Sequence, residues 1–140
     1  MRAGAGEGLR SRVDTTVATV IGIAIVGFVL RVAVLVRPIG VIDRLFVPDD
    51  TYYTLSIARS IAHGHGPTVD GHTLTSGFQA LLGFLLVPVY WLTDNLDLAL
   101  RIDLALLVVV DTLTIVLLAW VAYRFAGRVA AVTAAALWGV

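Results

Sequence analysis

The sequence contains no cysteine, so it can hold no disulfide and no thiolate-bound metal, and the redox compartment stays open. It also contains no lysine: all ten basic residues are arginine, and ten acids bring the formal net charge to zero. A nucleic-acid partner would require a basic excess. The composition therefore indicates that this chain does not bind nucleic acid.

Charged residues are few, at 14% of the chain, whereas hydrophobic residues make up 59% and the mean hydropathy is +0.92. A soluble domain of this length is much less apolar. The sequence therefore predicts an all-α, polytopic membrane protein, because helices satisfy their own backbone hydrogen bonds inside a bilayer. We expect a cell-membrane location with membrane lipid around the chain and the amino terminus in the cytoplasm.

Residues 1–16 are rich in glycine and carry three arginines, which predicts a flexible cytoplasmic tail. Residues 17–36 form an apolar run in which Arg31 is the only charge, and at ~1.5 Å per residue this run can cross a bilayer. No small-residue cleavage pattern follows, so we expect a retained anchor. Arg31 either anchors this helix at the interface or pairs with a later aspartate.

Residues 37–97 predict an outer loop that begins with a surface helix over residues 49–63. Pro48 precedes this helix, Asp49 is suited to be its N-cap, and Gly64 stops it. Its polar side chains share one arc, which predicts an amphipathic juxtamembrane helix: Tyr52, Ser56, Arg59, Ser60 and His63.

Residues 77–92 are apolar but only sixteen in number, with a proline near the far end, so they fit either a surface helix or a span. If they do not cross, residues 37–97 form one outer loop with three arginines against six aspartates, and Arg124 and Arg128 reach the cytoplasm. If they cross, both arginines lie outside. The positive-inside rule favours the first arrangement, with a second juxtamembrane helix over residues 77–92.

Residues 98–123 predict the second transmembrane helix, residues 124–128 a cytoplasmic loop, and residues 129–140 the start of a third transmembrane helix. The last segment is shorter than the ~20 residues that a span needs. We therefore expect the chain to be a piece of a longer protein.

Two acids lie inside the predicted second span. Asp111 falls near its middle, where an unpaired charge is expensive, so it should be protonated, paired or facing a polar cavity. Asp103 lies nearer the outer end, as Arg31 does in the first span. We therefore expect Arg31 and Asp103 to form an ion pair.

Asp49 and Asp50 form an acidic pair just past a hydrophobic span, where acids are costly. In a purely structural interpretation, Asp49 caps the helix and Asp50 is a first-turn acid favoured by the helix dipole. In a functional interpretation, the two carboxylates repel each other, one pKa rises, and a bound cation relieves the repulsion.

Several short motifs follow the first span in order: Asp49-Asp50-Thr51-Tyr52-Tyr53, Ala58-Arg59, His63-Gly64-His65-Gly66, Ala99-Leu100-Arg101 and Arg124-Phe125-Ala126-Gly127-Arg128. With an inner amino end, this order resembles the first outer loop of the C-type membrane glycosyltransferases (GT-C). That superfamily includes protein O-mannosyltransferases and lipid A aminoarabinose transferases. The resemblance extends from about residue 31 to residue 140.

The resemblance implies an enzyme that passes a sugar from a polyprenyl-phosphate carrier to an acceptor on the outer side of the membrane. By position, Asp49 would activate the acceptor or hold a divalent metal, with Asp50 as its neighbour in the metal site. Such a transfer passes through an oxocarbenium-like state, and a carboxylate can accept the acceptor's proton.

Other polar residues have two interpretations each. Arg59 could bind the carrier phosphate or pair with Asp50. Tyr52 could contact a phosphate or sugar, or serve as an interface aromatic. The three histidines are either metal ligands or solvated loop residues: His63, His65 and His72. They lack the i, i+4 spacing of helical zinc sites, which favours solvated loop residues.

Our leading hypothesis is the amino-terminal part of a metal-assisted membrane glycosyltransferase with a lipid-linked sugar as donor. We expect the 140-residue piece to be inactive alone. The alternative is a small non-enzymatic membrane protein, an assembly subunit or a transporter fragment, in which the acids only cap and solvate a surface helix.

Overall fold

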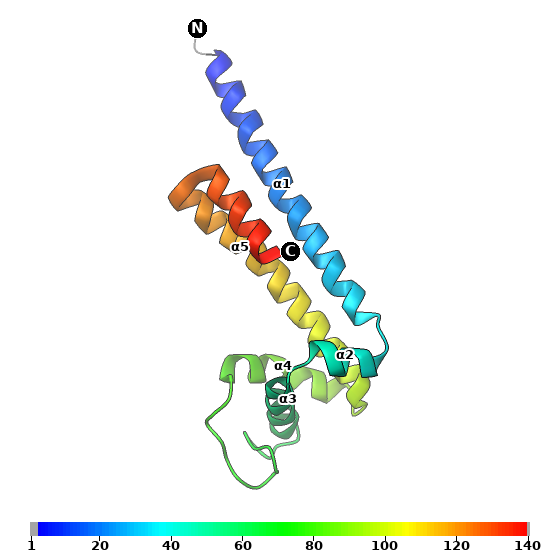
Figure 1. Ribbon diagram of the computed structural model, residues 1–140. Coiled ribbons are helices and arrows are strands. Elements are labelled where there is room, and N and C mark those ends of the chain that lie inside the picture. Colours follow the sequence, from blue (N-terminus) through cyan, green and yellow to red (C-terminus); the bar gives the residue numbers. More distant parts are fainter. Residues whose placement is uncertain (1–2, 140) are drawn as a thin grey trace. The chain divides into compact units, whose positions relative to one another are not determined.

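The computed structural model describes residues 3–139, with side chains from residue 14 onward. It is all-helical, as predicted, and residues 3–139 contain no strand beyond an isolated bridge between Thr68 and Leu74. The helices in that range are α1 (Ala3–Leu35), α2 (Ile39–Phe46), α3 (Asp49–Ala62), α4 (Ala80–Leu92) and α5 (Leu96–Gly139) (Figure 1).

Two of these helices, α1 and α5, are long and apolar enough to cross a membrane, over Asp14–Leu35 and Leu96–Gly139. The apolar helix α4 has thirteen residues, which gives a length of about 20 Å against a hydrocarbon core of about 30 Å. A straight helix of this length is shorter than that core, and the non-crossing arrangement stays a prediction.

The chain divides into two compact units. The first combines α1 up to Ala33 with the chain from Leu106 onward, and the second comprises Val34–Ala105.

In the first unit, α1 begins earlier than the span predicted from the sequence. The segment expected to be a flexible tail is helical from Ala3. Once a helix is nucleated, each further residue adds one hydrogen bond, and no proline interrupts this segment. The helix ends at Leu35, three residues before Pro38.

The long helix α5 reverses direction at Gly127, where φ is 80° and ψ is −164°. This backbone conformation is open almost only to glycine. Residues 96–126 and 128–139 are therefore two helical segments joined by one residue, and Figure 1 shows the second running back beside the first. Residues 124–128, predicted as a loop, are helical on both sides of Gly127.

Small side chains pack the first unit. Its buried cluster is made of one isoleucine and four alanines: Ala24, Ile115, Ala119, Ala131 and Ala135. Alanines and glycines let helix backbones approach closely. A Cβ placed on Gly27 would lie 2.5 Å from the carbonyl oxygen of Gly139, so α1 and the end of α5 are close enough to require glycine there.

A polar clamp of Arg31, Asp111 and Trp138 joins these helices. The Arg31 Nε atom lies 2.6 Å from Asp111 Oδ2, and Trp138 Nε1 donates to Asp111 Oδ1 at 2.8 Å. Arg31 also donates to the carbonyl oxygen of Gly139. Arg31 therefore pairs with a later aspartate, as one alternative held, but our choice of Asp103 as its partner was wrong. Asp103 and Asp111 are eight residues apart, about two turns of one helix, and the sequence alone did not show which of them lies level with Arg31.

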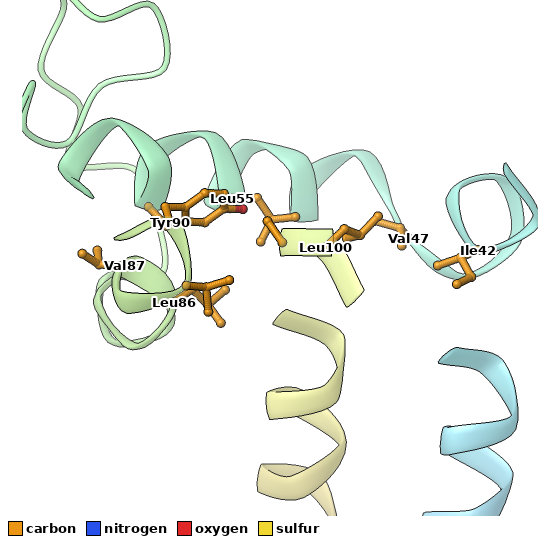
Figure 2. Packing of buried hydrophobic residues seen from close by; sticks show 10 residues of the cluster. Ile42, Val47, Leu55, Leu86, Val87, Tyr90 and Leu100 are labelled. Atoms are coloured by element: carbon orange, nitrogen blue, oxygen red, sulfur yellow. The ribbon is translucent and has the colours of Figure 1, made fainter. Parts of the chain in front are cut away.

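The second unit is built on α3 and α4, which pack against each other and against α2 and the first turns of α5. The labelled side chains of this cluster lie along one side of α3 (Figure 2): Ile42, Val47, Leu55, Leu86, Val87, Tyr90 and Leu100. Full burial of one such side chain contributes about 1.5–3 kcal/mol. This cluster fixes the face that α3 turns towards the core.

The short helix α2 was not predicted. It is eight residues long and lies within the predicted outer loop, in a stretch that carries Gly40, Asp43 and Arg44. Ile42 is fully buried within the cluster, which supplies the tertiary packing that a helix of this length needs. Arg101 closes the unit by donating to the carbonyl oxygens of Leu35 and Arg37.

Candidate functional site

The predicted acidic pair opens α3. Asp49 and Asp50 are its first two residues and both are exposed. The N-cap is Pro48, and no side chain caps the helix, so the prediction that Asp49 is the N-cap was wrong. Within residues 3–139 neither carboxylate has a hydrogen bond or an ion pair, and both lie where the helix dipole favours negative charge. Both are free to bind a ligand.

A cavity of about 370 Å³, the acidic pocket, lies beside α3 in the second unit. One part of its lining is apolar and the other polar. The apolar part consists of Ile39, Gly40, Leu55, Leu96 and Leu100, and the polar part of Asp43, Tyr52, Ser56, Arg59, Tyr90 and Asp97. Two of the predicted site residues, Tyr52 and Arg59, therefore meet here.

Asp49 and Asp50 do not line the acidic pocket. Asp49 precedes Tyr52 by three residues on α3, which places the two side chains on neighbouring turns of one helix face. The structure thus places the predicted acids about one helical turn from Tyr52 and more than two turns from Arg59.

Tyr52 is held by Asp43, which lies in α2. Its hydroxyl donates to Asp43 Oδ1 at 2.5 Å. That hydrogen bond, with partial burial and the nearby charges of Asp43 and Asp97, raises the pKa of Tyr52 to about 12. Because the hydroxyl proton is committed to Asp43, Tyr52 offers its oxygen to a ligand only as an acceptor.

Arg59 is the cationic residue of the acidic pocket. It lies nine residues after Asp50, about 13 Å along the helix, and the pair suggested for these two residues does not form. Across residues 3–139 its guanidinium has neither a carboxylate nor a hydrogen-bond partner. Arginine is always charged, so this side chain is available for an anion.

Tyr90 connects the pocket to a buried acid. Its hydroxyl donates to Asp103 Oδ2 at 2.9 Å, and Asp103 is 1% exposed. Burial and the neighbouring Asp103 carboxylate raise the pKa of Tyr90 above its ordinary value. The second oxygen, Asp103 Oδ1, has no hydrogen-bond partner in the described part of the chain.

Sequence reasoning missed four residues of this site: Asp43, Tyr90, Asp97 and Asp103. The charges of Asp43 and Asp97 entered only a count of loop acids. Tyr90 and Asp103 are thirteen residues apart in different helices, and no sequence spacing reports that contact.

No family model, curated protein or solved structure matches this chain. Its function must therefore be inferred from the chemistry of its own residues.

A second cavity of about 360 Å³, the histidine pocket, shares Ser56 and Arg59 with the acidic pocket. His63 and His65 line it, with ring centroids 6.5 Å apart and nearly parallel planes. His63 Nδ1 lies 2.8 Å from the carbonyl oxygen of Arg59, and His63 Nε2 lies 3.5 Å from Asp94 Oδ1. Arg59 thus borders both cavities.

The loop after α3 is organised by Asp70. Its carboxylate accepts from the backbone amides of His72 and Thr73, at 2.9 and 2.8 Å, and from the Thr73 hydroxyl at 3.0 Å. These bonds lower the pKa of Asp70 to about 2, the Thr73 amide contributing most. The third histidine, His72, is part of this turn and does not line the histidine pocket.

The described residues hold no group of three or more histidine or acidic side chains placed to share a metal ion. Asp49 and Asp50 supply two carboxylates. Mg²⁺ commonly takes one or two protein carboxylates together with waters and substrate phosphate oxygens. Among the described residues no third acid or histidine joins these two carboxylates.

Proposed function

We propose that this chain is the amino-terminal part of a membrane glycosyltransferase whose donor is a sugar on a polyprenyl-phosphate carrier. The observation that carries the proposal is the unpaired Arg59 guanidinium in a cavity that also holds two carboxylates and an apolar part. A polyprenyl-phosphate sugar has three parts that complement these groups: an anion for the guanidinium, hydroxyl groups for the carboxylates and a hydrocarbon tail for the apolar residues.

Each part of the donor has a matching group. The phosphate binds Arg59 through charge-assisted hydrogen bonds. The sugar hydroxyls donate to Asp43 and Asp97, and the Tyr52 oxygen accepts a hydrogen bond from a further hydroxyl. The prenyl tail contacts apolar residues at the edge of the cavity, among them Leu96 and Leu100.

Asp49 acts as the base that accepts the proton of the acceptor hydroxyl. It has no structural partner to satisfy, and it lies one turn from Tyr52 on the same helix. Asp49 and Asp50 would hold a divalent cation, which, when bound, neutralises charge on the phosphate leaving group. Asp50 serves only as a metal ligand in this arrangement.

The placement in the membrane belongs to the same proposal. The chain is multi-pass, its amino terminus is cytoplasmic, and α3 and α4 lie at the outer surface. Because the chain has no cysteine, single-cysteine variants report on topology directly. We expect an impermeant maleimide to label Ser76→Cys in intact cells and Ala126→Cys only after lysis. The reverse labelling pattern would place the acids on the wrong side.

Binding of the donor can be measured on the chain itself in detergent. Arg59→Gln should weaken binding of a polyprenyl-phosphate hexose about tenfold or more, since hydrogen bonds to charged groups contribute about 1.5–3 kcal/mol. Arg44→Gln is the matched control, because Arg44 is exposed on α2 and does not line the cavity. Equal binding by the two variants would remove Arg59 from the proposal.

Catalysis requires the longer protein to which this chain would belong. There, Asp49→Asn should leave donor binding nearly unchanged and lower transfer about 10²–10⁴-fold, the contribution of a general base. Full transfer by this variant would exclude Asp49 as the base. If the wild-type chain does not bind the donor at all, the non-enzymatic alternative is favoured.

A further inference from the structure

An apolar groove of about 490 Å³ lies in the first unit between α1 and the two segments of α5. Val17, Val20 and Ile21 line it from α1, and Val116 and Trp120 line it from residues 96–126 of α5. Ala131, on the returning segment, completes the lining. The polar residues of the acidic pocket do not line this groove.

One end of the groove is cationic. Arg124 lines it beside Tyr123, and the Arg124 guanidinium carbon lies 6.0 Å from the Trp120 ring centroid. In the part of the chain that the structure describes, Arg124 forms no ion pair with a carboxylate. The groove is therefore amphipathic along its length, with one positive charge at one end.

Its length matches half a bilayer. Val116 and Arg124 are eight residues apart, about 12 Å along the helix, and one leaflet of hydrocarbon is about 15 Å thick. Tryptophan and tyrosine gather at the level of lipid headgroups, so Trp120 and Tyr123 mark the end that meets the interface. Arg124 then lies at phosphate depth and Val116 lies among acyl chains.

We propose that this groove binds one anionic glycerophospholipid, with an acyl chain along Val20 and Val116 and the headgroup phosphate on Arg124. Basic sites between transmembrane helices on the cytoplasmic side select anionic headgroups. A second copy of the chain is disfavoured as occupant, because its own cationic end would meet this one. The proposal rests on the membrane placement given above but not on the glycosyltransferase activity.

The test is native mass spectrometry of the chain released from bilayers of mixed phosphatidylcholine and phosphatidylglycerol. The wild-type chain should retain phosphatidylglycerol in preference to phosphatidylcholine. Arg124→Gln should weaken this retention about tenfold, the contribution of one hydrogen bond between charged groups. The matched control is Arg128→Gln, which removes the same charge four residues away, outside the groove, and should leave retention unchanged.

Two further arms separate the groove from surface charge. Val17→Trp fills the groove, leaves Arg124 in place, and should abolish selective retention while circular dichroism stays helical. Soluble glycerol phosphate should not displace the lipid, since it lacks an acyl chain. Arg59→Gln, which addresses the donor site, should not alter retention.

Three results would overturn the proposal. Equal losses in Arg124→Gln and Arg128→Gln would mean general surface electrostatics. Equal retention of phosphatidylcholine would mean unselective filling by bulk lipid. A dimer that dissociates in Val17→Trp would make a second copy the occupant.

Discussion

Removing the Tyr90 hydroxyl should lower the free energy of unfolding, because Asp103 is buried and depends on that hydroxyl for its hydrogen bond. Asp103 is 1% exposed and receives one hydrogen bond, from Tyr90, while its other oxygen has no partner among residues 3–139. Tyr90→Phe leaves the carboxyl with no donor at all. A buried polar group stripped of its partner costs about 1–3 kcal/mol. We therefore expect that loss of stability, with a fall in Tm of roughly 4 °C for each kcal/mol.

Replacing both Tyr90 and Asp103 should restore much of the stability that Tyr90→Phe loses. In Tyr90→Phe with Asp103→Leu no polar group is stranded, and such paired replacement is often nearly neutral. A double-mutant cycle in detergent should therefore give a coupling of about 1 kcal/mol or more. Tyr53→Phe is the matched control, because its hydroxyl is exposed and its loss should change stability by no more than about 0.5 kcal/mol. Additive single effects would refute a direct Tyr90–Asp103 interaction.

Three further predictions concern other elements. Because the pKa of Asp70 is lowered to about 2, its carboxylate stabilises the turn above pH ~4, and this stabilisation is lost as the pH falls towards about 2. Amide hydrogen exchange in the turn should therefore become faster at low pH, and Asp70→Ala should make it faster at neutral pH. Arg31→Met should destabilise the chain by about 1–3 kcal/mol, since Asp111 loses its ion pair and keeps the hydrogen bond from Trp138, and adding Asp111→Leu should recover stability; failure to recover would argue against the pair. Gly127→Ala should cost about 1–3 kcal/mol in thermal unfolding, whereas Gly22→Ala, in open space within α1, should be neutral or stabilising.

The helices were predictable where composition and stop signals agree. Asp49 starts α3 as expected, because Pro48 directs the chain into a new helix there. Gly64, with φ of 81°, follows its end. The all-α class follows from the same apolar runs that make α1 and α5 long enough to cross a membrane.

What the sequence could not supply was partnership between distant side chains. The sequence prediction paired Arg31 with Asp103 from their depths in the two spans, but the structure pairs it with Asp111, about two turns further along α5. The pocket depends on α2, whose helicity comes from burying Ile42 and not from its own propensity. Asp43 therefore lines the pocket although no local sequence pattern indicated this position.

The clamp between Arg31 and Asp111 also has a meaning for biosynthesis. An aspartate near the middle of a membrane helix raises its apparent insertion free energy by about 2.5–3.5 kcal/mol when the helix enters alone. In the membrane placement proposed above, α1 is synthesised first, so Arg31 would already be in the membrane when α5 leaves the ribosome. With that placement, α5 is expected to insert less efficiently when α1 is absent.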